Sequence, residues 1–340
     1  MTDTTGTVLT DADDLQRFTE QVLQRLGTSA DDARDMAAQI VDSELAGHES
    51  HGLRRLPEYV ERATSGHADP RAEITVEADA GALVRIDGNR GFGHLVLRDA
   101  TRIAVERAKR YGIAGVGVRR AEWAGRFVEF ARMAAEEGVA TLLFANTSGA
   151  AQVAAPPGGL EARLSTNPIA FGIPRASGPH LVLDMATTAV AMGRVSEWRD
   201  RGEEIPDEWT NGDVLQFLGG AKGFGLALVA EALAGALSGA GTVSADPAED
   251  RQGVFLIAID IAHLRDLDEF TAEVDRFADY VKDAPLEPGA RPVRLPGEGS
   301  AATASRRRAE GVPMQRFTWE QMAALADRLE VRPIAEAGAR

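Results

Sequence analysis

The chain has 340 residues, enough for two or three domains with a sizeable core. Its net charge of −15 repels phosphate backbones and anionic membranes, so neither nucleic acid nor a membrane is an expected partner. The absence of cysteine excludes disulfides, thiolate zinc sites and cysteine nucleophiles, and the six histidines lack HExxH spacing, so no metal site is expected. No signal peptide or apolar membrane span is visible, which predicts a cytoplasmic location.

The N-terminal part of the chain, residues 1–72, has a helical pattern. Apolar residues at helical spacing predict helices over residues 10–26, 28–45 and 55–64. A glycine and a proline that follow the third helix end it.

Short apolar runs then alternate with helical patterns over residues 73–265, which is typical of an α/β domain. Residues 266–340 are helical again, and we expect them to pack with residues 1–72 as one helical domain. The predicted strands are residues 83–87, 113–118, 140–145, 169–173, 181–183 and 254–259, and the predicted helices 95–111, 127–137, 224–237 and 318–329.

The segment His-Glu-Ser-His-Gly-Leu-Arg-Arg, residues 48–55, follows the second predicted helix. It places Ser50 beside His51, and Arg55 one helical turn further on. An imidazole beside a hydroxyl can exchange a proton, and a guanidinium can bind a carboxylate. An enzyme that acts on a small carboxylic acid needs both groups. The alternative is a helix end whose histidine only caps carbonyl groups.

Two other motifs favour structural interpretations. Gly88-Asn-Arg-Gly-Phe-Gly has the order GxxGxG, and no acidic residue follows where a Rossmann fold binds the ribose, so we expect a tight turn. The basic run at residues 306–308 is expected to be a solvated helix face.

Three further polar residues are candidates for a binding site. Asn167, held out of the helical region by Pro168, offers both a donor and an acceptor. Asp184 ends an apolar strand, where it can cap a helix or orient a histidine. Lys222 lies in the glycine-rich stretch 219–225 and can meet a phosphate, although no Ser or Thr follows it as in a P-loop. A purely structural role is the alternative for each residue.

Together, these segments resemble the malate/L-lactate dehydrogenase family. This family lacks a Rossmann fold and also contains sulfolactate and ureidoglycolate dehydrogenases and Δ1-piperideine-2-carboxylate (ketimine) reductases. The segments occur in the family's order over residues 10–330. They are Ser50-His-Gly-Leu-Arg-Arg, Gly88-Asn-Arg-Gly-Phe-Gly, Ala155-Pro-Pro-Gly-Gly, Thr166-Asn-Pro-Ile-Ala-Phe, Asp184-Met-Ala-Thr-Thr-Ala-Val-Ala, Lys222-Gly-Phe-Gly-Leu-Ala and Leu295-Pro-Gly-Glu.

The resemblance implies a non-Rossmann, sulfolactate dehydrogenase-like α/β domain that binds a nicotinamide, and a helical domain built from both chain ends. It also implies a homodimer with the active site near the subunit interface. By position, His51 resembles the family's proton donor, Ser50 and Asp184 its relay partners, and Arg55 the residue that binds the substrate carboxylate. The positions that resemble contacts to NADPH or NADH are Thr147, Ser148, Asn167, Asp184, Met185, Ala186 and Lys222.

The chain departs from the family at several positions. Trp123 stands where a second histidine belongs, and an indole cannot exchange a proton at neutral pH. Ser165 replaces a usual glycine, and Arg194 stands where a lysine often follows Gly193. These departures argue against malate and lactate as substrates and fit a member recruited to a specialised pathway.

We therefore expect an NAD(P)H-dependent reductase that transfers hydride to the carbon next to a carboxylate. A cyclic or alkyl imino acid is the preferred substrate, because one histidine suffices and Trp123 can stack on a ring as part of the substrate pocket. The alternatives are a 2-hydroxy acid or 2-oxo acid dehydrogenase of malate/lactate type, and a redox-inactive binding or non-redox protein. The choice between NADH and NADPH stays open.

Overall fold

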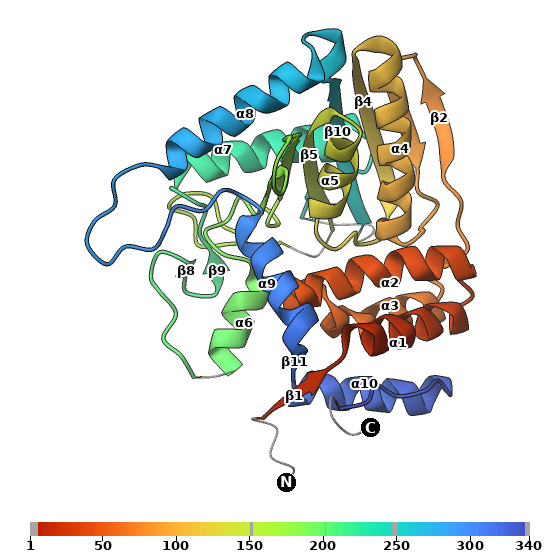
Figure 1. Cartoon of the computed structure of the whole chain (residues 1–340). Helices are drawn as coiled ribbons and strands as arrows, with labels where there is room; N and C mark the ends of the chain where they lie inside the picture. Colours follow the sequence, from red (N-terminus) through yellow and green to blue (C-terminus); the bar gives the residue numbers. More distant parts are fainter. Residues whose placement is uncertain (1–5, 150–151, 201, 246–250, 337–340) are drawn as a thin grey trace.

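The computed structural model describes residues 6–149, 152–200, 202–245 and 251–336. Its centre is a seven-stranded sheet in the order β2-β3-β4-β10-β5-β6-β7 (Figure 1). Within this described sheet β3 and β4 pair in parallel, and every other neighbouring pair is antiparallel. The strands are β2 (Thr75–Asp79), β3 (Leu83–Asp87), β4 (Ile113–Ala121), β5 (Val139–Ser148), β6 (Ile169–Ile173), β7 (Leu181–Met185) and β10 (Arg251–Asp260).

Helices cover both faces of the sheet, which is why its central strands are apolar almost without interruption. On one face, alanines of α4 (Gly93–Tyr111) and α5 (Val128–Glu136) pack against the valines and leucines of β4, β10 and β5. On the other face, α7 (Ala221–Ala230) and its π-helical continuation η3 (Glu231–Leu237) pack around Phe144. The small alanine side chains let these helices approach the sheet closely.

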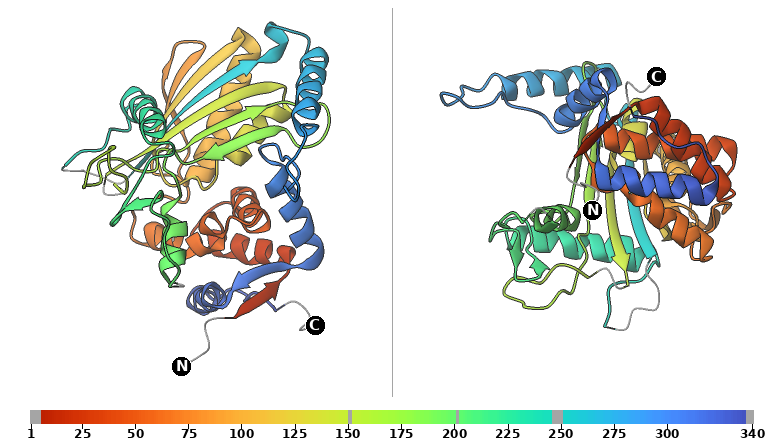
Figure 2. Two further views of the ribbon diagram at one scale, coloured as in Figure 1. Left: turned by 90° about the vertical axis from the view of Figure 1, so that its left-hand side faces the viewer. Right: turned by 90° about the horizontal axis from the view of Figure 1, so that it is seen from below.

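A second layer is built from both ends of the chain and lies below the sheet in Figure 1 and in the left-hand view of Figure 2. Its helices share one apolar core, and β1 pairs antiparallel with β11. Asp11 and Ser29 start the first two helices by accepting backbone N–H groups. The elements of this layer are β1 (Thr7–Thr10), α1 (Ala12–Arg25), α2 (Ala30–Leu45), α3 (Leu56–Thr64), α9 (Glu298–Glu310), β11 (Val312–Gln315) and α10 (Arg316–Leu329).

Further elements outside the sheet and the second layer are α6 (Met192–Asp200), the hairpin of β8 (Thr210–Asn211) and β9 (Val214–Leu215), and α8 (Leu267–Lys282). In α8, Asp275 accepts a hydrogen bond of 2.8 Å from Arg175 Nε, in the loop after β6. The expected boundaries after residues 72 and 265 stay a prediction. The contacts of α8 favour starting the C-terminal helical part only after this helix.

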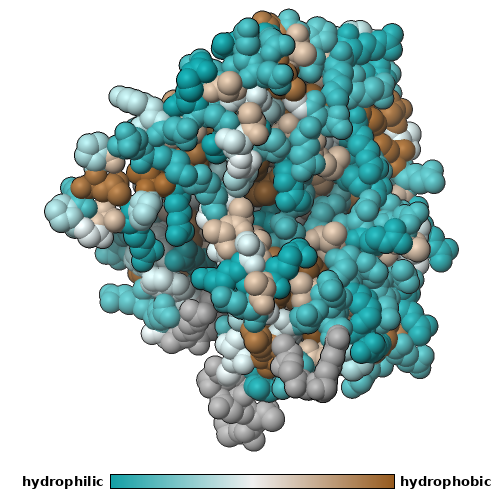
Figure 3. All heavy atoms as spheres, viewed as in Figure 1, coloured by the Kyte–Doolittle hydropathy of each residue, from teal (hydrophilic) through white to brown (hydrophobic). Residues whose placement is uncertain are grey.

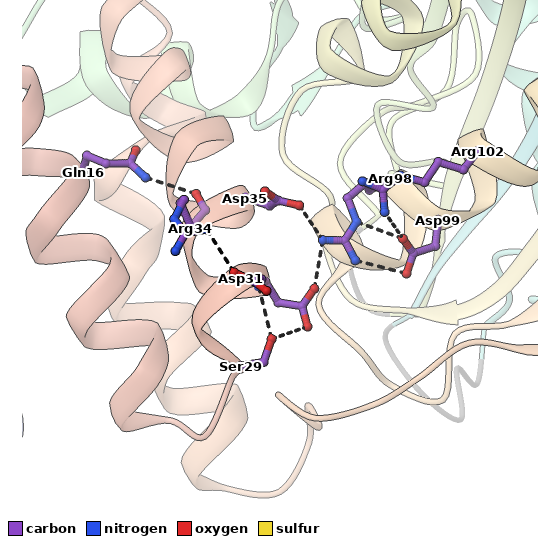
Figure 4. Close-up of polar contacts among 9 residues, drawn as sticks. Gln16, Ser29, Asp31, Arg34, Asp35, Arg98, Asp99 and Arg102 are labelled. Carbon is purple, nitrogen blue, oxygen red and sulfur yellow. Dashed lines mark hydrogen bonds and ion pairs between the residues drawn. The ribbon is translucent and has the colours of Figure 1, made fainter.

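Arg98 joins the two layers through an ion-pair network (Figure 4). From α4, its Nη1 lies 2.7 Å from Asp35 and 2.9 Å from Asp32, both on α2, while Nε lies 2.9 Å from Asp99. Burial alone would lower the pKa of Arg98, but the hydrogen bonds with Asp99 and Asp32 outweigh it and raise the pKa. Arg98 therefore fixes the start of α2 relative to the sheet.

The face of the molecule shown in Figure 3 is mainly hydrophilic, in keeping with the acidic composition. Among the helices that the structure describes, none combines the length and the apolar character needed to cross a bilayer.

Candidate active site

The segment of residues 48–55, here called the Ser-His turn, connects α2 to α3 through two 3₁₀ turns, η1 (Glu49–His51) and η2 (Leu53–Arg55). Ser50 Oγ lies 3.0 Å from Nδ1 of His51. The start of α6 packs directly on Ser50, because a Cβ added to Gly193 would lie 3.2 Å from the Cβ of Ser50. The Ser-His pair thus lies where the helical layer meets α6.

The buried side chain of Glu44, in the last turn of α2, holds the Ser-His turn. Its Oε1 accepts a 2.7 Å hydrogen bond from the amide of Leu53, and a Cβ on Gly52 would lie only 2.3 Å from the same oxygen. Burial, and then the neighbouring carboxylate of Glu49, raise the pKa of Glu44 to about 8. Glycine at position 52 is therefore required by close packing rather than by a flexible hinge.

His51 lies in surroundings that disfavour its charged form. Burial, and then the cations of Arg55, His48 and Arg126, lower the pKa of His51 to about 4. His94 on α4 is fully buried, and burial together with His51 lowers its pKa to about 3. Both imidazoles are therefore neutral near pH 7 in the free protein.

Arg55 combines hydrogen bonds within the turn with a stacking contact. Its Nε donates to the carbonyl oxygen of Ser50 at 2.9 Å, and its Nη1 to Glu58 at 3.1 Å. Its Cζ lies 5.1 Å from the ring centroid of Trp123, and the Cζ of Arg62 lies 5.5 Å from the same ring. The structure therefore brings Arg55 and Trp123 together, with the indole in contact with two guanidinium groups.

Asp184, near the end of β7, accepts a 2.7 Å hydrogen bond from the amide of Phe127 and so binds the start of α5. Burial raises the pKa of Asp184 to about 6, against the opposing effects of this amide and of Arg126. Within the described part of the chain, no hydrogen bond joins Asp184 to His51. In this structure the carboxylate of Asp184 binds the start of α5 instead, and the relay from His51 to Asp184 stays a prediction.

Arg126 is a buried cation of this region that sequence reasoning missed. Its Nη2 lies 2.6 Å from Asp42, and its Nε donates to Ser43 at 3.1 Å, so it ties α2 to the start of α5. Its charge affects the pKa values of both His51 and Asp184. No local pattern could have indicated this position, because its partners lie more than 80 residues earlier in the chain.

The candidate cofactor residues gather at one end of the sheet. The amide and hydroxyl of Thr187 donate to the carbonyl of Thr166 at 3.0 and 2.9 Å. A Cβ on Gly223 would lie 2.5 Å from the carbonyl of Thr187, so the start of α7 abuts the segment after β7. The amide of Ala145 in β5 donates to the carbonyl of Pro168 at 3.0 Å. These contacts bring together Thr147 and Ser148 at the end of β5, Asn167 before β6, Asp184 and Met185 at the end of β7, Ala186 directly after it, and Lys222 in the first turn of α7.

The side chains of these candidate cofactor residues differ in how far they are exposed to solvent. Lys222 is exposed, and Gly219 and Gly220, both with positive φ, leave the first turn of α7 open to an anion. Asn167 has a φ of 35° and is fully buried, with its amide donating to Ala227 at 3.1 Å and to Glu231 at 2.7 Å. The structure thus fits a phosphate-bearing cofactor at Lys222, with Asn167 supporting the site from inside.

Among the described residues, no group of histidines and carboxylates could hold a metal ion.

Comparisons with known proteins match the malate/L-lactate dehydrogenase family along almost the whole chain. The family model for malate/L-lactate dehydrogenase matches residues 10–323. The malate dehydrogenase of Pyrococcus abyssi is 35% identical over 94% of this chain and 94% of its own.

Solved structures agree with these sequence matches. A malate dehydrogenase structure from Pyrococcus horikoshii has a TM-score of 0.85 and 31% identity, covering 96% of this chain and 97% of its own. The Δ1-piperideine-2-carboxylate reductase of Pseudomonas syringae has a TM-score of 0.79 and 27% identity, covering 94% and 99%. The expected fold class, a non-Rossmann α/β domain with a helical layer from both chain ends, is confirmed.

Proposed function

Because the chain belongs to the malate/L-lactate dehydrogenase family, we propose that it is a nicotinamide-dependent oxidoreductase acting at the carbon next to a carboxylate. The observation that carries this proposal is the Ser-His turn. There, a hydroxyl–imidazole pair 3.0 Å apart shares one segment with a half-buried guanidinium. These groups supply the two functions that such a reaction needs from the protein, a proton exchanger and a carboxylate receptor.

In the proposed reaction, Arg55 binds the substrate carboxylate and His51 exchanges a proton with the substrate heteroatom. Ser50 holds Nδ1 of His51 in both protonation states, because a hydroxyl can donate as well as accept, and this leaves Nε2 to face the substrate. Neutral His51 suits removal of a proton from a hydroxyl group. In the reverse direction, the bound carboxylate offsets the charge of Arg55, which raises the pKa of His51 and favours its protonated form.

A nicotinamide would supply or accept the hydride, held by residues 184–186 and by Lys222. The end of β5, at Thr147 and Ser148, would border the same site, and Asn167 would support it from inside. The test is Lys222→Ala, which should weaken binding of NADH or NADPH, measured by cofactor fluorescence. The fold should stay intact because this lysine is exposed. Unchanged cofactor affinity in this variant would remove Lys222 from the site.

A 2-hydroxy acid or 2-oxo acid is the substrate class we now favour. The preference for an imino acid rested on Trp123 stacking against a substrate ring, but the indole contacts Arg55 and Arg62 instead. We propose that Trp123 fixes the guanidinium that receives the carboxylate. The malate dehydrogenases among the relatives support this choice.

An imino acid remains the second candidate, because position 123 lacks a second imidazole and the piperideine-2-carboxylate reductase has a similar fold. A screen of NADH and NADPH oxidation against 2-oxo acids and cyclic imino acids separates the two classes. Turnover of imino acids alone would reverse our preference. Trp123→His should mainly raise KM, because it removes the stacking partner of Arg55. An unchanged KM would show that Trp123 does not position Arg55.

The third possibility, a family member without redox chemistry, predicts no cofactor oxidation with any substrate of the screen. Arg55 and Lys222 argue against it, because a redox-inactive protein has no need for a carboxylate receptor together with an exposed lysine at an open helix start.

A further inference from the structure

Helix α9, from the C-terminal part of the chain, packs against the Ser-His turn. Arg307 lies 2.7 Å from Glu49, the residue before Ser50, through its Nη2. Its Nη1 donates to the carbonyl oxygen of Glu44 at 2.6 Å. Two turns earlier in α9, Ser300 Oγ lies 3.2 Å from Nε2 of His48. The turn is therefore held from the other end of the sequence.

The basic run of residues 306–308 is only in part the solvated face that its sequence suggests. Arg306 and Arg308 are exposed, but the side chain of Arg307 is only 15% exposed and turns toward the end of α2. A Cβ on Gly47 would lie 3.4 Å from Thr303 and 3.8 Å from Arg307, which shows how closely α9 follows this part of the chain. Arg307 therefore points toward the interior, whereas Arg306 and Arg308 are exposed and can serve as controls.

Arg307 also serves an electrostatic purpose at this position. Glu44 and Glu49 repel each other, and this repulsion adds to burial in raising the pKa of Glu44. The Arg307 cation pairs with Glu49 and opposes that shift. Because one planar guanidinium bonds both Glu44 in the last turn of α2 and Glu49 at the start of η1, it sets the angle between them.

We propose that Arg307 is a positioning residue that sets the orientation of the Ser50–His51 pair for proton transfer. This rests on the proposed function of His51, since Arg307 acts only through the turn and touches no reacting atom. Besides its hydrogen bond to the carbonyl of Ser50, Arg55 has two supports that do not involve Arg307, namely Glu58 and Trp123. Loss of Arg307 should therefore disturb proton transfer more than carboxylate binding.

The test compares Arg307→Met with Arg306→Met in the full-length protein. Arg307→Met should lower kcat by about 10- to 100-fold, because small displacements of a reacting group are costly. Its KM for the carboxylate substrate and its cofactor affinity should change by less than about 3-fold, since the supports of Arg55 remain. Arg306→Met should behave as the unaltered protein. Arg307→Lys should recover only part of the lost kcat, because it restores the charge opposite Glu49 but not the planar fork that also reaches the carbonyl of Glu44.

A second comparison tests whether the loss of kcat in Arg307→Met comes from the missing ion pair or from a folding defect. Glu49→Gln should lower kcat to a similar extent, and the double variant with Arg307→Met should be no worse than either single variant, because both remove one ion pair. Equal kcat in Arg307→Met and Arg306→Met, with His51→Ala inactive, would overturn this inference and leave the proposed function standing. A loss in Arg307→Met that lysine does not restore would reduce the residue to a structural role. A fully active His51→Ala variant would overturn both.

Discussion

His51 is the proposed proton exchanger, and its surroundings determine at which pH it holds a proton. Burial and the cation of Arg55 keep the imidazole neutral at physiological pH in the free protein. The same arrangement makes its proton affinity responsive to substrate, because a bound carboxylate cancels the nearest positive charge. The residue is thus suited to both directions of a hydroxy acid and oxo acid interconversion.

The protonation of His51 yields a pH prediction. Its pKa in the free protein should lie well below the ordinary value of 6.5, near the value of about 4 set by burial and Arg55. The kcat/KM for reduction, which needs the protonated form, should therefore fall as pH rises from 5 to 8. For oxidation, the neutral form is already present and kcat/KM should not fall over this range. Imidazole NMR titration, with and without an unreactive carboxylate, measures the pKa directly; a free-protein value above 6.5 would contradict this picture.

Arg55 yields a prediction on substrate binding. Arg55→Lys keeps the charge but loses the planar fork and its contact with Trp123, so KM for the acid should rise by about 10-fold or more. Arg54, its exposed neighbour, provides the matched control, and Arg54→Lys should leave KM unchanged. Steady-state kinetics with an acid and its amide decide the matter. If acid and amide are turned over equally well, Arg55 does not bind the carboxylate.

At the scale of single residues, the sequence indicated those candidate site residues that lie close together along the chain. Ser50, His51 and Arg55 lie within six positions, so their cooperation is visible in the sequence. Glu44, Arg126 and Arg307 act through contacts that appear only in the folded chain, and no local sequence pattern marks them. The relay through Asp184 stays a prediction, because the hydrogen bond that its carboxylate accepts in this structure comes from the amide of Phe127, before α5.

Among the elements, the contact between α2 and α4 fixes the start of α2 relative to the sheet. Arg98 binds Asp32 and Asp35 across this contact and is 12% exposed, whereas Arg102 on the same helix is 60% exposed (Figure 4). Arg98→Met should lower the free energy of unfolding by about 1–2 kcal/mol, since its partners keep access to water. Arg102→Met should change it by less than about 0.5 kcal/mol. Urea unfolding measures both, and equal effects would show that the network does not stabilise the contact.

The presence of the helices was easier to predict than the residues at which they begin and end. It was also easier to predict than the pairing of strands that lie far apart in the sequence. Periodic apolar residues indicated α1, α2 and α4, because one face of each helix is buried. The pairing of β1 with β11 joins segments about 300 residues apart, and neither four-residue strand is distinctive by itself. The last helix was expected to begin at residue 318, but α10 already begins at Arg316. Residues 49–55 form 3₁₀ turns because Glu44 binds the amide of Leu53.

At the scale of the whole molecule, an apolar surface on α7 and η3 supports the expected homodimer. Leu226, Leu228, Val229 and Leu237 are between 40% and 57% exposed along one continuous helical segment. Such a surface marks an interface more often than scattered single residues do. Because Lys222 starts the same helix, a partner subunit bound here would lie near the proposed cofactor site.

This surface leads to a prediction on assembly. In sedimentation experiments the protein should have twice the mass of one chain, and Leu228→Asp should produce monomers, because a buried unpaired carboxylate is costly. Tyr280→Asp on α8, where the tyrosine is 82% exposed, should leave the dimer intact. A Leu228→Asp variant that still sediments as a dimer would show that the interface lies elsewhere.

The central claim is that this chain moves hydride between a nicotinamide and a carboxylate-bearing substrate with His51 exchanging the proton. The most direct measurement is the oxidation of NADH and NADPH with 2-oxo acids by the unaltered protein and by His51→Ala, alongside cofactor binding. We expect turnover by the unaltered protein. In His51→Ala the turnover rate should fall by about 10²- to 10⁴-fold, while the cofactor affinity stays unchanged. A His51→Ala variant that works at the unaltered rate would contradict the central claim.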